Sequence, residues 1–298
     1  MEFRQLKCFL AVAECLHFGR AAESVHLSQP ALSLQIRALE EELGVQLFFR
    51  DHHRTQLTPA GTVLVEDARQ ILSLCASATQ HVQRAALGEV GTVRVGFIST
   101  AAALLVPQIV KEFHRLYPGI HLELRNVLTD DQVSQLIAQK LDVGLLRVPL
   151  NTAPEIVTNV IHKERFVLLL PVGHPLAGKK PFTMEDLRSE DFIIYTRKLA
   201  AGFHDRIMSI FSAAGFCPQI TQTVSEMYTL VSLVAAGQGI SIAPASVLLH
   251  RTKNVIARPL PMKAPLSEIA LAYNRENLSP AARHFVRIIM KMYAAGAL

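Results

Sequence analysis

The sequence predicts an α+β multi-domain chain of three parts: a small N-terminal domain of helices and one β-hairpin, a single long helix, and a larger α/β domain. Three observations predict it. Helical apolar periodicity fills residues 3–43, a seven-residue repeat follows over 64–85, and strands alternate with helices from residue 91 onward. At roughly 100–200 residues per domain, 298 residues fit this division. We therefore expect domain boundaries at 1–58, 59–88 and 91–298.

The N-terminal part contains three predicted helices. The first covers residues 3–16 and a short second one covers 20–26. Ser28 and Pro30 begin the third, because a serine side chain caps free N–H groups and proline suits the first turn. This helix ends at Gly44, a residue that readily adopts the left-handed conformation of a helix end. Four of its residues are expected to pack inward: Leu32, Ile36, Leu39 and Leu43.

A hairpin and a long helix come next. Residues 45–57 form two short extended pieces around the polar tip Asp51-His52-His53-Arg54. Thr58-Pro59 then opens a helix that runs to about Gly88, roughly 40 Å long. Its apolar residues recur at alternating steps of four and three, which predicts pairing with a second chain rather than packing on its own domain. We expect these residues in the dimer seam: Leu64, Ala68, Ile71, Cys75, Ala78 and Val82.

The C-terminal part alternates strands and helices, which predicts a largely parallel sheet with helices on both faces. The expected strands are 92–98, 120–126, 142–146, 166–170, 192–194, 240–243 and 269–273; the expected helices are 101–117, 131–139, 203–214, 225–236 and 280–294. We expect two lobes, 91–163 plus 266–298 and 164–265, joined by two crossings that act as a hinge.

Composition excludes several classes of protein. Half of the residues are apolar and 18% are charged, so the chain buries a core and is not disordered. The sequence has no run of about 18 apolar residues and no secretion signal, which indicates a cytoplasmic protein without membrane contact. Its four cysteines lack zinc spacing and are expected to be buried apolar residues rather than a redox switch. We expect neither a metal nor a cofactor.

The net charge of +5 does not by itself indicate nucleic-acid binding, because residues 1–58 carry six Lys and Arg against seven Asp and Glu. The arrangement of the third helix is more informative. Its outward side presents small and polar residues near the N-terminus, which suits a DNA major groove, while Glu40, Glu41 and Glu42 lie at the far end. The expected DNA-binding residues are Ser28, Gln29, Pro30, Ser33, Leu34 and Arg37, together with Arg50 and Arg54 beside the hairpin tip.

The segment from Ala21 to Gly61 resembles the LysR-type transcriptional regulators. The resemblance is carried by Ala21-Ala22, Leu27-Ser28-Gln29-Pro30-Ala31-Leu32-Ser33, Ile36, Leu39-Glu40, Leu43-Gly44, Leu47-Phe48, Arg50 and Leu57-Thr58-Pro59-Ala60-Gly61. It implies a winged helix-turn-helix, a dimeric linker helix, a homotetramer built as a dimer of dimers, and a periplasmic-binding-protein-like effector domain. The implied partners are double-stranded promoter DNA with an inverted repeat, RNA polymerase and a small organic-acid effector.

Leu34 departs from the family, many members of which carry a basic or polar residue there. Two interpretations stay open. In one, the outward side chain touches a thymine methyl group; in the other, it packs on a neighbouring side chain.

The effector site is predicted from two strand ends, because ligands in open α/β sheets lie beyond the carboxyl ends of strands. Ser99-Thr100-Ala101 and Thr129 each begin a helix after such a strand, which suits a carboxylate, although ordinary helix capping explains each alone. Arg147 ends its strand and is either a partner of a second carboxylate or a surface arginine. The residues around Thr100, the Tyr195 segment and Val234–Ser246 are similar to the branch that senses benzoate, muconate and phenylpropanoid acids. This implies that Thr100 and Thr129 hold the carboxylate and that Phe203 lies near the opposite wall.

Two other classes of protein are disfavoured. A periplasmic solute-binding protein needs a signal peptide and has no helix-turn-helix. An enzyme is disfavoured because no G-x-S-x-G, Walker or H-E-x-x-H motif occurs. The motif Tyr195-Thr196-Arg197-Lys198 lacks the proline of several relatives, so the effector's identity stays open.

Overall fold

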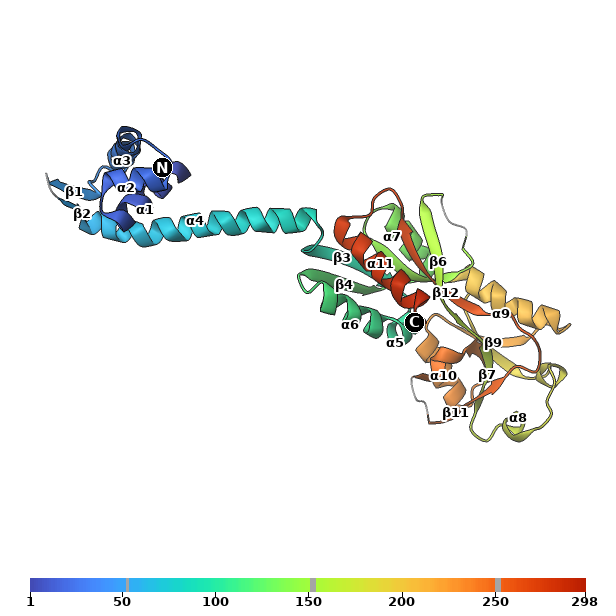
Figure 1. Ribbon diagram of the computed structural model, residues 1–298. Coiled ribbons are helices and arrows are strands. Elements are labelled where there is room, and N and C mark those ends of the chain that lie inside the picture. The colour runs from blue at the N-terminus through green and yellow to red at the C-terminus, as the bar shows by residue number, and fades with distance from the viewer. Residues whose placement is uncertain (52–53, 151–153, 250–252) are drawn as a thin grey trace. The chain divides into compact units, whose positions relative to one another are not determined.

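The computed structural model describes residues 1–51, 54–150, 154–249 and 253–298, and only the backbone at residues 50, 51 and 54. The chain forms two compact units, Met1–Arg84 and Ala85–Leu298 (Figure 1). The first unit contains α1 (Phe3–Cys15), α2 (Phe18–Ser24), α3 (Gln29–Leu43), the hairpin β1 (Phe48–Asp51) and β2 (Arg54–Leu57), and most of α4 (Pro59–Ala86).

Helix α3 is the third predicted helix, and its two ends are as the sequence indicates. The Ser28 hydroxyl accepts a hydrogen bond from the N–H of Ala31, and Gly44 ends the helix with φ of +69°. Leu32, Ile36 and Leu39 are buried. The inward packing of the fourth residue is wrong, because Leu43 is 39% exposed. The chain turns away at Gly44, so this last residue of the helix has no neighbouring element to cover it.

The start of α4 is joined to the hairpin. The Thr58 hydroxyl accepts from the N–H of Gly61 at 2.9 Å and donates to the carbonyl of Gln46 at 2.7 Å. The helix therefore begins at Pro59 as expected, with Thr58 as its cap.

The second unit begins with a five-stranded sheet in the order β4-β3-β5-β12-β6. The strands are β3 (Gly91–Phe97), β4 (Ile120–Asn126), β5 (Val143–Val148), β6 (Ile156–Glu164) and β12 (Ser267–Asn274). One face packs on α5 (Ser99–Leu104), α6 (Val106–Leu116) and α11 (Pro280–Ala294), and the other on α7 (Thr129–Ile137). We call this sheet with its helices lobe I.

The rest of the second unit, lobe II, has a separate core. It contains a three-stranded sheet in the order β10-β7-β11 and the pair β8-β9. Its elements are β7 (Phe166–Pro171), α8 (Pro175–Gly178), η1 (Glu185–Leu187), β8 (Asp191–Tyr195), α9 (Ala201–Ala213), β9 (Gln219–Val224), α10 (Met227–Ala235), β10 (Ser241–Pro244), η2 (Ala245–Leu249) and β11 (Val255–Pro259).

The expectation of a largely parallel sheet is wrong. In the described part of lobe I, β3 pairs in parallel with β4 and β5, while β12 is antiparallel to both β5 and β6. The reason is the double crossing: β6 leaves lobe I where β12 returns, with Glu164 opposite Ser267, so the two strands run in opposite directions. In lobe II, β7 pairs antiparallel with both of its neighbours.

Among the described strands and α-helices, three strands, the short helix α8 and one helix break differ from the sequence expectation. Strands β6, β9 and β11 were not expected. A single helix was expected over 101–117, but the structure has two helices there, α5 and α6, which are separated at Leu105. Pro107 explains the break, because it has no N–H to donate to the preceding turn.

Candidate functional site

The outward face of α3 is the first candidate site. Gln29, Leu34 and Arg37 are exposed and Ser33 is half-buried. Leu34 is 65% exposed, so no neighbouring side chain covers it. Ser28 and Pro30 are also exposed at the start of the helix. This face therefore presents a guanidinium, an amide, a hydroxyl and one apolar side chain to solvent.

Other expected DNA contacts lie on or near the hairpin. The backbone of Arg50 and of Arg54 lies in β1 and β2, on either side of the tip, while both side chains and all of His52-His53 lie outside the described residues. Glu40 stabilises the fold here, because its Oε1 accepts from the N–H groups of Leu47 and Phe48, at 2.9 and 3.3 Å. The carboxylate thus ties the end of α3 to the start of the hairpin.

The predicted seam on α4 divides into two parts. Leu64, Ala68 and Ile71 pack on the core of their own domain, with Ala68 fully buried. Further along, Ala78 is exposed and Val82 is 71% exposed, while Cys75 is half-buried. Leu74 was not singled out from the sequence and is 72% exposed.

The expected effector residues gather where lobe I meets lobe II. Thr100 lies in α5, Thr129 begins α7, Arg147 lies near the end of β5, and Phe203 lies in α9. The two threonine hydroxyls do not cap their helices, whose N-cap residues are Ile98 and Leu128 without side-chain hydrogen bonds. Helix capping therefore does not explain them.

Arg147 is the group around which these residues are arranged. Its Nη2 donates to the Thr100 Oγ1 at 2.8 Å, its Nη1 donates to the Ser267 Oγ, and its backbone N–H donates to the Thr129 Oγ1 at 3.3 Å. The guanidinium also lies 4.4 Å from the centre of the Phe203 ring. Only 7% of the residue is exposed, so the interpretation as a surface arginine is wrong.

Burial of Arg147 leaves a charge without a matching carboxylate. Desolvation lowers its pKa to about 10, with Glu164 and Tyr195 acting in the opposite direction. The guanidinium is therefore still charged at neutral pH. Among the described residues it forms no ion pair, and its side-chain hydrogen bonds go to two hydroxyls. A buried charge of this kind is costly unless an anion joins it.

A small inner cavity of about 40 Å³ lies beside this arginine. Its lining comes from both lobes: Ile98, Ser99, Thr100, Leu128, Thr129 and Arg147 from lobe I, and Tyr195, Ala200, Phe203 and Met227 from lobe II. Donors cluster on the lobe I side, whereas lobe II supplies mainly aromatic and apolar surface. The cavity therefore suits a carboxylate, but its volume is well below the roughly 150 Å³ in which a benzene ring binds.

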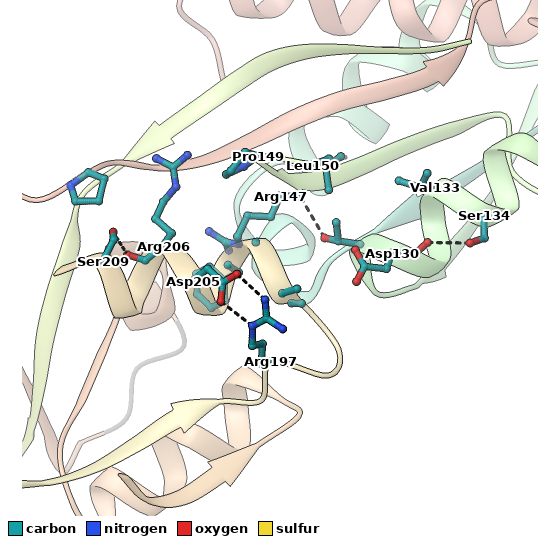
Figure 2. A pocket seen from close by; sticks show the side chains of 16 residues that line it. Asp130, Val133, Ser134, Arg147, Pro149, Leu150, Arg197, Asp205, Arg206 and Ser209 are labelled. Carbon is teal, nitrogen blue, oxygen red and sulfur yellow. Dashed lines mark hydrogen bonds and ion pairs between the residues drawn. The ribbon is translucent and has the colours of Figure 1, made fainter. Parts of the chain in front are cut away.

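A larger outer cleft of about 760 Å³ continues from it and shares Thr129, Arg147, Ala200 and Phe203 (Figure 2). Arg197 and Asp205, which line this cleft, form a bidentate ion pair. The Nε–Oδ1 distance is 2.9 Å and the Nη2–Oδ2 distance is 3.0 Å. The two cavities together have room for an acid whose carboxylate enters the inner one and whose ring occupies the outer one.

One expected effector residue does not line either cavity, and some lining residues were not expected from the sequence. Ala101 lines neither cavity, since its side chain is buried in the core and its N–H donates to the Ile98 carbonyl. Ser99 lines the inner cavity as expected. Ser267 and Met227 carry no sequence signal, because only the sheet register and the packing of lobe II bring them to the site.

Within the described ranges, no group of three His, Cys, Asp or Glu is placed to hold a metal ion. No helix in that part of the chain is long and apolar enough to cross a bilayer.

Comparison with known proteins identifies relatives for both units. Residues 3–62 match the model of the bacterial regulatory helix-turn-helix protein, lysR family, and residues 86–294 match the LysR substrate binding domain. The chain is 39% identical to the uncharacterized HTH-type transcriptional regulator YnfL of Escherichia coli K12, over 96% of each chain. It is 32% identical to the Hca operon transcriptional activator HcaR of the same organism, over 99% of each.

A solved structure agrees over nearly the whole length. Full-length CbnR complexed with its target DNA superposes with a TM-score of 0.85 at 31% identity, covering 98% of this chain and all of that one.

Proposed function

The chain belongs to the LysR family of DNA-binding transcriptional regulators, whose members are not enzymes, and on that basis we propose which residues bind DNA and which bind the effector. Helix α3 enters the major groove of promoter DNA. A small organic acid, most simply one with an aromatic ring, binds between the lobes and sets promoter activity. The protein acts in the cytoplasm as a homotetramer, a dimer of dimers, with RNA polymerase as its further partner.

The DNA half of the proposal rests on the exposed face of α3. Gln29, Ser33 and Arg37 supply hydrogen-bond donors for DNA base edges and phosphates. Arg50 and Arg54 would contact the sugar-phosphate backbone of the DNA beside the groove. Leu34 would touch a thymine methyl group, since its exposed side chain has no polar atom to offer a phosphate. Binding of wild type and Leu34→Arg to operators with thymine replaced by uracil tests this; equal discrimination by both proteins contradicts the methyl contact.

The effector half rests on one observation: the buried Arg147 guanidinium faces a cavity and has no carboxylate partner among the described residues. A ligand carboxylate would supply the missing charge and accept from the Thr100 and Thr129 hydroxyls. Phe203 and the outer cleft would hold the ring. The resemblance to the benzoate- and muconate-sensing branch supports an aromatic acid or a ring-cleavage product.

A thermal-shift screen of aromatic and dicarboxylic acids, followed by footprinting with each acid that binds, tests the effector half. Acids are expected to raise the melting temperature of wild type, because a ligand of the folded state stabilises it. Thr100→Val is expected to abolish that rise while leaving DNA affinity unchanged, because it removes one acceptor of Arg147 and one donor to the ligand. Thr158→Val, an exposed position on β6, is the matched control. A rise that persists in Thr100→Val would show that the acid binds elsewhere.

A further inference from the structure

Tyr195 is a buried polar group that the arrangement described so far does not use. It ends β8 in lobe II, is 8% exposed and lines the inner cavity. Across the described ranges, its hydroxyl forms no hydrogen bond to the protein. Among the described residues, the Tyr195 oxygen is not one of the solvent-excluded polar atoms without a partner, so it opens on the cavity and can donate to a ligand atom there.

The other polar groups of the inner cavity lie across from it, on lobe I. The Thr100 and Thr129 oxygens accept from Arg147, which leaves their hydroxyl protons free for a ligand. Two hydroxyls and one guanidinium satisfy the oxygens of one carboxylate. With those oxygens satisfied from lobe I, the Tyr195 hydroxyl, which comes from lobe II, is available to a further acceptor.

The ring of Tyr195 is held in place by its neighbours. It packs edge-to-face on Phe203, with ring centres 5.7 Å apart, and Phe203 in turn lies under Arg147. Burial raises the pKa of Tyr195 to about 12, with Glu226 adding to the rise. The phenol is therefore a protonated donor over the whole physiological range.

We propose that Tyr195 determines effector specificity by donating a hydrogen bond to a second oxygen on the carbon next to the effector's carboxylate. The effector is then a 2-oxo or 2-hydroxy acid. The inner cavity has a volume of about 40 Å³. It has no room for additional carbon atoms between the effector's carboxylate and its second oxygen, so that oxygen must lie on the adjacent carbon. This inference rests on the proposed function, since it assumes that the carboxylate lies against Thr100, Thr129 and Arg147.

The test compares two probes that differ by one oxygen, phenylacetate and phenylglyoxylate, by isothermal titration of the full-length protein. Wild type is expected to bind phenylglyoxylate about two- to twelvefold more tightly, the range that one neutral hydrogen bond supplies. Tyr195→Phe is expected to reduce this ratio to about one. It should not lower the melting temperature without ligand, since the hydroxyl has no partner in the described protein. Tyr293→Phe, on the exposed side of α11, should keep the wild-type ratio.

The possible failures are distinguishable. If wild type binds both acids equally, or if Tyr195→Phe keeps the preference, the role of Tyr195 is overturned and the effector site stands, provided that Thr100→Val binds neither acid. If wild type binds neither acid at millimolar concentration, the aromatic-acid site itself is wrong and the inference goes with it.

Discussion

At the scale of single residues, Arg147 carries a cost in stability that the proposed effector would offset. Its charge is buried, yet its side-chain hydrogen bonds in the described protein go to the hydroxyls of Thr100 and Ser267. Hydroxyls compensate a buried guanidinium less well than a carboxylate does, because they bring no opposite charge. The ligand-free protein therefore carries a destabilising charge, which the carboxylate of the proposed effector would neutralise.

This argument predicts the behaviour of Arg147→Gln. Glutamine keeps an amide donor for the hydroxyls and removes the buried charge, so the ligand-free protein is expected to melt a few degrees higher, for a gain of about 1 kcal/mol. Stabilisation by an acid should be lost. Differential scanning calorimetry with and without the acid measures both effects.

Arg125→Gln is the control, since Arg125 is half-buried on β4 and paired with Glu123. If Arg147→Gln has a lower melting temperature than wild type and is still stabilised by acids, the buried charge of Arg147 neither destabilises the ligand-free protein nor binds the acid.

At the scale of elements, the first turn of α4 fits closely under the hairpin. A Cβ atom added at Gly61 would overlap the carbonyl oxygen of Leu47 and touch Leu57. The same Leu47 carbonyl accepts from the N–H of Thr58, and Thr58 caps the helix. Glycine is thus required at residue 61, because the Leu47 carbonyl lies too close to leave room for a Cβ atom. These contacts fix the start of α4 to the hairpin.

Gly61→Ala is expected to destabilise the N-terminal unit by about 2 kcal/mol, because backbone rather than a flexible side chain must move. It should also weaken operator binding, since the hairpin shifts relative to α3. Chemical denaturation and a DNA-binding titration measure the two effects.

Gly44→Ala provides the comparison. It has open space around it but a φ of +69°, so it should cost only about 1 kcal/mol. Equal costs for the two variants would argue against the close approach at residue 61.

At the scale of the whole molecule, exposed apolar side chains on α4 offer a surface for the proposed pairing of two chains. The first half of the predicted seam packs inside its own domain, so Leu64, Ala68 and Ile71 are already covered. In the second half, Ala78 and Val82 remain exposed and Cys75 is half-buried; Leu74, outside the predicted seam, joins Ala78 and Val82 in an exposed row at steps of four. We propose that this stripe, rather than the whole seven-residue repeat, forms the dimer contact.

Leu74→Glu is expected to lower the assembly state, because a buried carboxylate without a partner is costly in such a contact. Size-exclusion chromatography with light scattering should show a smaller species, and operator affinity should fall with it. Ala76→Glu is the matched control, since residue 76 lies about 200° around the helix from residue 74. An unchanged mass for Leu74→Glu would place the dimer contact elsewhere.

The amino-acid sequence was sufficient for whatever depends on neighbours in the chain: the Ser28 cap, the Gly44 stop, the start of α4 at Pro59, the exposed face of α3 and the family. The remaining features required the packed structure. Sequence spacing did not reveal that Arg147 is buried, because Ser267 reaches it 120 residues later on a strand that returns from the other lobe. Local sequence spacing also did not predict three other features. These are the antiparallel direction of β12, the hydroxyl of Tyr195 without a partner in the described protein, and the burial of half of the α4 seam. Each depends on contacts between distant segments, whose register and burial are set by the packed lobes and not by local periodicity.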